Sequence, residues 1–144
     1  MRSGTFLRYW LPVLVMMGFI FLASTDTFSS ANTFSVIKPI IRFFDPAISK
    51  LKLRTINNAI RKSAHLSEYF VLGLVLFRAF RSGRSEKGII LRSAFLSVLI
   101  VALYSGTDEL HQAFTATRGP EVMDVGIDTL GGALAQVVSM IRLR

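Results

Sequence analysis

Apolar residues in this chain form long runs and do not follow the spacing of amphipathic helices or strands. Four of these runs are long enough, or nearly so, to cross a hydrocarbon core of about 30 Å at about 1.5 Å per helical residue. The sequence therefore predicts an all-α integral membrane fold, in a single domain over residues 1–144. The four predicted transmembrane helices cover residues 6–23, 63–80, 89–114 and 122–141.

The segment between the first two runs has a different character. It opens with polar residues and becomes amphipathic, with apolar side chains at helical spacing from Phe34 to Phe44. Pro39 and Pro46 are expected to divide it into short pieces. We predict one or two interfacial helices lying on the lipid head groups over about residues 33–60. A disordered loop is the alternative.

Composition supports a membrane environment. The chain is 51% hydrophobic over 144 residues, which is too apolar for a soluble domain with so little interior. It has no cysteine, which excludes disulfides and thiolate metal sites. Arg2 and Arg8 precede the first apolar run as in a signal peptide, but the run is longer than the apolar region of such a peptide. We therefore expect an uncleaved first span.

The charge balance is basic, with 17 Lys and Arg against 9 Asp and Glu. No known nucleic-acid-binding module is evident, so nucleic acid is not expected as a partner. The basic residues flank the apolar runs, and we expect them to contact anionic head groups of membrane lipids. They divide almost equally between the two faces. The short basic loop at residues 81–88 decides the orientation, giving a multi-pass cell-membrane protein with both termini cytoplasmic.

Chain alternation brings the start of the second span, the end of the third and the start of the fourth to one membrane face. Under the predicted orientation this face is external. Helical spacing then gathers residues of each span on a common side. Asp128 lies one turn deeper than Asp124, where a carboxylate is costly unless it is paired or hydrated. The candidate residues are Lys62, His65 and Tyr69; Asp108, Glu109, His111 and Gln112; Arg118 in the following loop; and Asp124 and Asp128.

Each of these residues also has a purely structural interpretation. His65 and Tyr69 are compatible with interfacial positions, and Asp108 with a span boundary. Asp124 is compatible with the first turn of a helix, where an acid stabilises the dipole. Asp128 is compatible with an ion pair to Arg118 or Lys62. Their collection at one face favours a shared polar pocket.

The pattern resembles the VanZ-like family. It consists of Lys62-x-x-His65-x-x-x-Tyr69, Asp108-Glu109-x-His111-Gln112-x-Phe114-x-x-x-Arg118 and Asp124-x-x-x-Asp128-x-x-Gly131. The resemblance covers roughly residues 60 to 140. It implies a polytopic bacterial or archaeal membrane protein of the cell envelope, whose founding member is linked to resistance to the glycopeptide teicoplanin. It does not assign a biochemical activity.

Three kinds of function follow from this pocket. In the first, the protein binds or modifies an envelope lipid, a lipid-linked precursor or a glycopeptide-related ligand. Whether it is an enzyme stays open, because no known catalytic motif occurs. In the second, it is a non-enzymatic protein that alters surface charge, lipid organisation or glycopeptide access. In the third, it is a small proton- or cation-coupled transporter subunit that requires homo-oligomers to enclose a path.

The residues divide into roles under the first hypothesis. The catalytic candidates are His65 and His111 as general base and Asp108 and Glu109 as its orienting carboxylates. The candidates for ligand binding are Lys62, Arg118, Tyr69 and Gln112, with Arg61 as a further cation. Asp124 and Asp128 are the candidates for a divalent cation, and the histidine and carboxylate set would also suit a transition metal.

Overall fold

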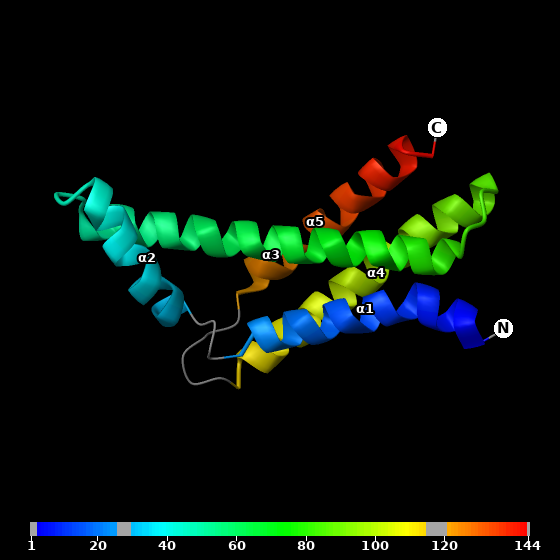
Figure 1. Cartoon of the computed structure of the whole chain (residues 1–144), viewed down its shortest axis with the longest axis horizontal. Coiled ribbons are helices and arrows are strands. Elements are labelled where there is room, and N and C mark those ends of the chain that lie inside the picture. The colour runs from blue at the N-terminus through cyan, green and yellow to red at the C-terminus, as the bar shows by residue number, and fades with distance from the viewer. Residues whose placement is uncertain (1–2, 26–29, 115–120, 144) are drawn as a thin grey trace.

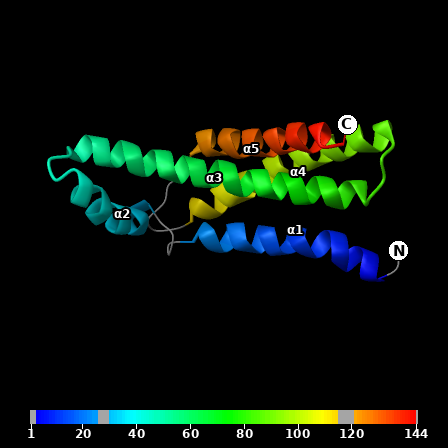
Figure 2. The ribbon, with the colours of Figure 1, turned by 45° about the horizontal axis from the view of Figure 1, so that its top comes forward.

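The computed structural model describes residues 3–25, 30–114 and 121–143, and within these ranges the chain is all-α with no strand. Four helices run side by side, and the fifth, α2, lies at one end along the N-terminal part of α3 (Figures 1 and 2). The helices are α1 (Ser3–Ala23), α2 (Ser30–Phe44), α3 (Lys50–Arg81), α4 (Lys87–Gln112) and α5 (Val122–Ile141).

Two described helices are long and apolar enough to cross a membrane. They are α1, over Phe6–Ala23, and α4, over Lys87–Gln112, each with a mean hydropathy of 1.9. Both follow the predicted spans closely, and α5 has the predicted bounds. α3 and α5 are long enough but more polar, because they hold the charged residues described below. Length and hydropathy therefore support two of the four predicted spans.

The segment before the second span differs from the prediction. α3 has 32 residues and is about 48 Å long, so it extends well beyond a core of about 30 Å. Residues 50–60 are its first turns and not a separate interfacial helix. The Ser49 side chain caps this start by accepting a hydrogen bond from the backbone N–H of Lys52 at 3.3 Å. The expectation that this segment is divided into short pieces was wrong for residues 50–60.

Proline has a smaller effect on this segment than expected. Pro39 lies inside α2, which continues to Phe44, whereas Pro46 falls in the connection to α3. A proline removes one backbone donor and crowds the preceding turn, but it does not forbid a helix that is held by tertiary contacts. α2 packs against α3, which supplies tertiary contacts of this kind.

The packing of α3 on α5 depends on small residues. A Cβ atom on Gly131 would lie 2.5 Å from the Leu66 carbonyl oxygen, and one on Gly73 would lie 2.9 Å from the Ala135 Cβ. The two backbones are therefore closer than larger residues would allow. α3 also contacts α1 and α4, and the apolar core forms around it. The buried core residues are Val13, Ile20, Tyr69, Leu72, Leu76, Ala79 and Val101.

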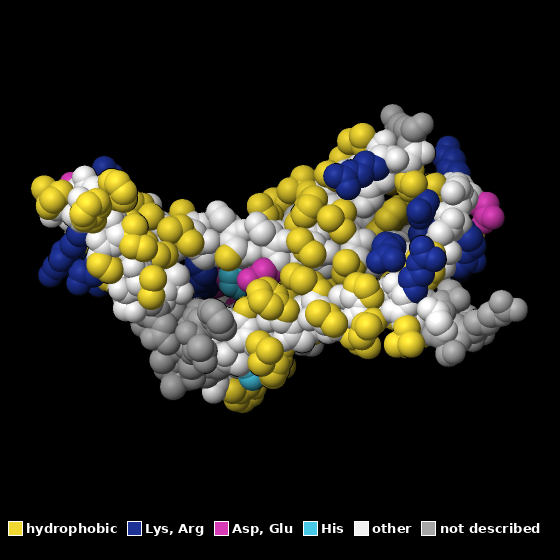
Figure 3. All heavy atoms as spheres, viewed as in Figure 1, with side chains coloured by type: hydrophobic (Ala, Val, Ile, Leu, Met, Phe, Trp, Pro, Cys, Tyr) yellow, Lys and Arg dark blue, Asp and Glu magenta, His cyan; other side chains and the backbone are white. Residues whose placement is uncertain are grey.

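The outer surface of the bundle is strongly apolar. Figure 3 shows hydrophobic side chains spread over its helices, with basic side chains gathered toward the ends. Such a surface would be unusual for a soluble monomer and suits lipid as the solvent. On α1 and α4 the exposed large side chains include Leu7, Leu11, Leu14, Val15, Leu22, Leu91, Phe95, Leu99 and Leu103.

Candidate functional site

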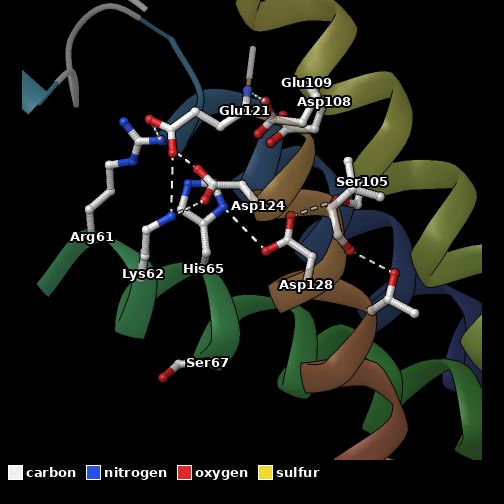
Figure 4. Close-up of polar contacts among 12 residues, drawn as sticks. Arg61, Lys62, His65, Ser67, Ser105, Asp108, Glu109, Glu121, Asp124 and Asp128 are labelled. Atoms are coloured by element: carbon white, nitrogen blue, oxygen red, sulfur yellow. Dashed lines mark hydrogen bonds and ion pairs between the residues drawn. The ribbon is translucent and has the colours of Figure 1, made fainter. Parts of the chain in front are cut away.

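The centre of the polar cluster is a carboxylate on α5 held by two cations on α3. Asp124 is completely buried in the first turn of α5. Arg61 Nη2 donates to its Oδ2, and Lys62 Nζ donates to its Oδ1 at 2.7 Å. Figure 4 shows the three side chains pointing toward one another. Such charge-assisted pairs are the condition under which a buried carboxylate is tolerated.

A second carboxylate shares the same two cations. Glu121, just before α5, places Oε1 3.3 Å from Arg61 Nη2 and Oε2 3.3 Å from Lys62 Nζ. Its side chain is 49% exposed, in contrast to that of Asp124. Its backbone N–H donates to Glu109 Oε2 at 2.7 Å, which anchors the start of α5 to the end of α4.

The acids shift the pKa values of both cations. Burial opposes charge on the Arg61 guanidinium, but the hydrogen bond and charge of Asp124 outweigh it, and the pKa of Arg61 is raised. The hydrogen bond to Asp124 is the main cause that raises the pKa of the Lys62 ammonium. Both groups therefore stay charged throughout the physiological range.

One turn deeper, a histidine faces a second buried carboxylate. His65 Nδ1 lies 3.3 Å from Asp128 Oδ1, and Ser105 on α4 donates to Asp128 Oδ2 at 2.6 Å. The His65–Asp128 pair is close enough for an ion pair but is not aligned for a hydrogen bond, since neither atom has a hydrogen-bond partner within the described residues. Figure 4 shows His65 between Lys62 and Asp128 on the inner side of α3.

The end of α4 supplies two further buried acids. Asp108 Oδ2 accepts a hydrogen bond from Gln112 Nε2 at 3.2 Å, one turn along the same helix. Glu109 contacts the α5 N-terminus as described, while its Oε1 atom is buried without a hydrogen-bond partner in the described part of the chain. The polar middle of α3, the end of α4 and the start of α5 therefore meet, as alternation predicted.

Of the remaining candidates, one lies apart from this cluster, one is buried beside Ser105 and the acids of the cluster, and one falls outside the described residues. His111 does not join Asp108 and Gln112 in the interior, because its ring packs against Phe21 with the ring centroids 4.7 Å apart. Tyr69 is fully buried, and its ring centroid lies 6.3 Å from that of Tyr104. Arg118 lies outside the described residues.

The predicted metal site gains little support from this geometry. Asp124 is already neutralised by two cations, and Asp128 is engaged by Ser105 and His65. In the portion of the chain that the structure describes, no three His, Asp or Glu side chains form a group suited to a metal ion. A divalent cation on Asp124 and Asp128 remains a prediction from the sequence.

A cavity opens beside the charged cluster, between α1, α2 and α3. Its volume is about 290 Å³. Arg61, His65 and Glu68 project into it from successive turns of α3, at spacings that place them on one face. Figure 3 shows a hollow between these helices in which an acidic and a histidine side chain reach the surface. The remaining lining is Phe19, Ala23, Ser24, Thr33, Asn57, Ile60 and Ala64.

Comparison with known proteins gives the same family that the sequence pattern resembles. The chain matches the VanZ/LLP1 family over residues 9–143, which is nearly all of its length. The chain belongs to the VanZ/LLP1 family. No curated protein and no solved structure matches it.

Membership of the VanZ/LLP1 family identifies the chain as a membrane protein and leaves its ligand open. The match includes the α1–α2 region as well as the three helices that carry the polar pattern. The cavity lies between these two parts of the chain, because α1 and α2 form its walls opposite the charged face of α3.

Sequence reasoning missed several residues that the structure makes prominent. Ser105 lies one turn before Asp108 on the same face of α4, which is the only signal that could have placed it in the cluster. Arg61 was named only as a further cation, although it precedes His65 by one turn. Nothing in the sequence indicated that Phe19 and Ile60, from distant segments, would line a common cavity.

Proposed function

We propose that this protein binds the anionic head group of an envelope lipid or lipid-linked precursor in the cavity between α1, α2 and α3. The observation that carries the proposal is the composition of the cavity wall. Its lining combines apolar side chains, among them Phe19, Ile60 and Ala64, with Arg61 and His65, and Glu68 is the acid in this lining. This combination suits an amphiphile, because burial of the chain and charge-assisted contacts with the head then act together.

The size of the cavity limits the ligand. Small-molecule sites in proteins measure about 300–1,000 Å³, and this cavity lies at the lower end. It suits a lipid head group with the first part of a chain. A whole glycopeptide is far larger than a drug-sized ligand and does not suit it. Any link to teicoplanin resistance would therefore act through a bound envelope lipid and not through direct capture of the antibiotic.

The position that we propose for the cavity in the membrane agrees with the same ligand class. We propose four spans in the cell membrane, with both termini cytoplasmic and the charged cluster at the external boundary. Lipid head groups lie at that depth. The part of the cavity wall nearer the membrane centre would meet the acyl chains. The α2–α3 hairpin would rest among anionic head groups through its basic residues, with exposed Phe43 and Phe44 near its tip.

Blocking the cavity tests this proposal. Ala64 lines the cavity, and Ala59 is an exposed residue of the same helix that does not. We expect Ala64→Phe to lose phospholipid that copurifies with the protein, measured by native mass spectrometry, whereas Ala59→Phe keeps it. In cells, any teicoplanin resistance that the protein confers would be lost in Ala64→Phe and kept in Ala59→Phe. Equal lipid occupancy in both variants would exclude the cavity as the site.

A second function is favoured by the contact between His65 and Asp128. A carboxylate 3.3 Å from Nδ1 stabilises the charged form of the imidazole, while Nε2 is left for a substrate. His65 also lines the cavity, so it is placed to act as a general base on a bound lipid. Lipid turnover by wild-type protein but not by His65→Asn, with binding retained in both, would support an enzyme. If the lipid is recovered unchanged from both proteins, the protein binds the lipid and is not an enzyme that modifies it.

A further inference from the structure

We infer that the Glu121 carboxylate occupies the place of a ligand phosphate, and that phosphate binding at Arg61 and Lys62 displaces it. This inference rests on the proposed function and names the head-group chemistry. Glu121 presents two oxygens to two cations, each at 3.3 Å. Two oxygens of a phosphate group can make the same pair of contacts, since Arg and Lys both bind phosphate.

Charge balance requires a displacement. Arg61 and Lys62 carry two positive charges, and Asp124 and Glu121 carry two negative charges. A phosphate that entered without any release would place three anionic groups on two cations. Within this group of four side chains, one acid must therefore lose its partners when the ligand binds.

Burial decides which acid leaves. The Asp124 side chain has no exposed surface, so its release would leave an unpaired charge in the interior. The Glu121 side chain is 49% exposed and can pass into water at little cost. Water screens the ion pairs of a carboxylate that is half exposed, so they hold it only weakly.

The backbone around Glu121 allows its side chain to move alone. Its N–H is held by Glu109 Oε2 at 2.7 Å, and its carbonyl oxygen accepts from the Asp124 N–H at 2.7 Å. Neither contact involves the Glu121 carboxylate. On Arg61, both acids are bound through Nη2, and the same residue lines the cavity, whereas Lys62 and Glu121 lie beside it and are not among its lining residues.

Removing the charge of Glu121 tests the exchange, with dioctanoyl phosphatidic acid as the probe and calorimetry on the full chain in detergent as the measurement. We expect Glu121→Gln to tighten binding by about three- to tenfold, because the internal competitor is gone. Glu86→Gln is the matched control, since it removes the same charge from an exposed residue of another helix start, and its affinity should equal that of the wild type. The gain in affinity should vanish in the double variant Arg61→Met/Glu121→Gln, which lacks the cation that binds the phosphate.

Two further probes separate the sources of phosphate. A gain with phosphatidic acid but not with inorganic phosphate assigns the site to a lipid head group, whereas a gain with both assigns it to phosphate as such. Unchanged or weaker binding in Glu121→Gln would overturn the exchange, as would an equal gain with dioctanoylglycerol, which lacks the phosphate. If the exchange is overturned but Ala64→Phe abolishes the binding of phosphatidic acid, the proposal that the cavity binds lipid survives. If Ala64→Phe binds as well as the wild type, the proposed function itself fails.

Discussion

Lys62 Nζ lies 2.7 Å from Asp124 Oδ1, across the interface between α3 and α5, and the Asp124 side chain has no contact with solvent. This pair and its neighbour Arg61 fix the polar end of the bundle, because a buried carboxylate is tolerated only where cations reach it. The cavity, the dyad of His65 and Asp128 and the exchangeable Glu121 all lie next to this point.

Removal of the cations should destabilise the protein unequally. Arg61 is the less exposed of the two cations, and Arg61→Met leaves Asp124 with Lys62 alone. We expect this variant to lose on the order of 3 kcal/mol in unfolding free energy. Lys62→Met should cost less, because the Lys62 side chain is 32% exposed against 19% for Arg61. Denaturant unfolding in detergent measures both, with Lys52→Met on the exposed start of α3 as the control. Equal losses for Lys62→Met and Lys52→Met would show that Lys62 does not stabilise Asp124.

The close packing of α3 on α5 gives a prediction with an internal control. Gly131→Ala would drive a Cβ atom to within 2.5 Å of the Leu66 carbonyl oxygen, so the helices must separate and the melting temperature should fall clearly. Gly126→Ala lies in the same helix, where the new Cβ meets nothing within 4 Å. That variant should be neutral or gain about 0.5–1 kcal/mol from helix propensity. Similar effects of the two substitutions would contradict the described approach of the backbones.

Alkaline pH should weaken the same helix pair. The hydrogen bond to Asp124 raises the pKa of Lys62 above its usual value of 10.5, so the native state binds this proton more tightly than the unfolded chain. The resulting stability is fully present below pH 10.5 and is lost as pH rises through the native pKa. We therefore expect the melting temperature of the wild type to fall above about pH 10.5 relative to that of Lys62→Arg, whose guanidinium keeps its charge to higher pH. Parallel pH profiles would argue against a role of Lys62 protonation.

The proposed orientation is open to cysteine labelling, since the chain has no cysteine of its own. Ser85→Cys lies in the short loop between α3 and α4, and Leu51→Cys is exposed at the start of α3. We expect an impermeant maleimide to label Leu51→Cys in intact cells and Ser85→Cys only after permeabilisation. The reverse pattern would place the cavity on the cytoplasmic side.

The sequence predicted the helices wherever apolar runs define them. α5 begins at Val122 and ends at Ile141, as expected, and the ends of α4 lie within two residues of the prediction. The long start of α3 was missed because residues 50–60 are too polar to signal a span. Its cap was nevertheless readable, since Ser49 precedes the helix as a typical N-cap residue. In the structure this segment also packs against α2, a tertiary contact that no local pattern records.

The sequence predicts which helical segments meet at the site, but it does not predict which side chains pair with one another. Alternation correctly brought the starts of α5 and of the second span together, so Lys62 and Asp124 were both named. The sequence suggests Arg118 or Lys62 as the partner of Asp128; among the described residues, which do not include Arg118, the structure gives it His65 and Ser105. Such choices depend on helix rotation and sub-ångström packing at Gly73 and Gly131, which one sequence does not specify. The cavity depends further on how α1 and α2 pack, and no local pattern records this.

Photo-crosslinking with a diazirine-bearing phosphatidic acid tests the central claim most directly. The lipid would be added to the purified protein in nanodiscs, and the modified residues would be mapped by mass spectrometry. The cavity proposal predicts that adducts concentrate at Phe19, Ile60 and Ala64 and are lost when unlabelled phosphatidic acid competes. Adducts spread evenly over outward residues such as Leu99 and Leu103, with no competition at Ile60, would show that the lipid only surrounds the bundle and does not enter it.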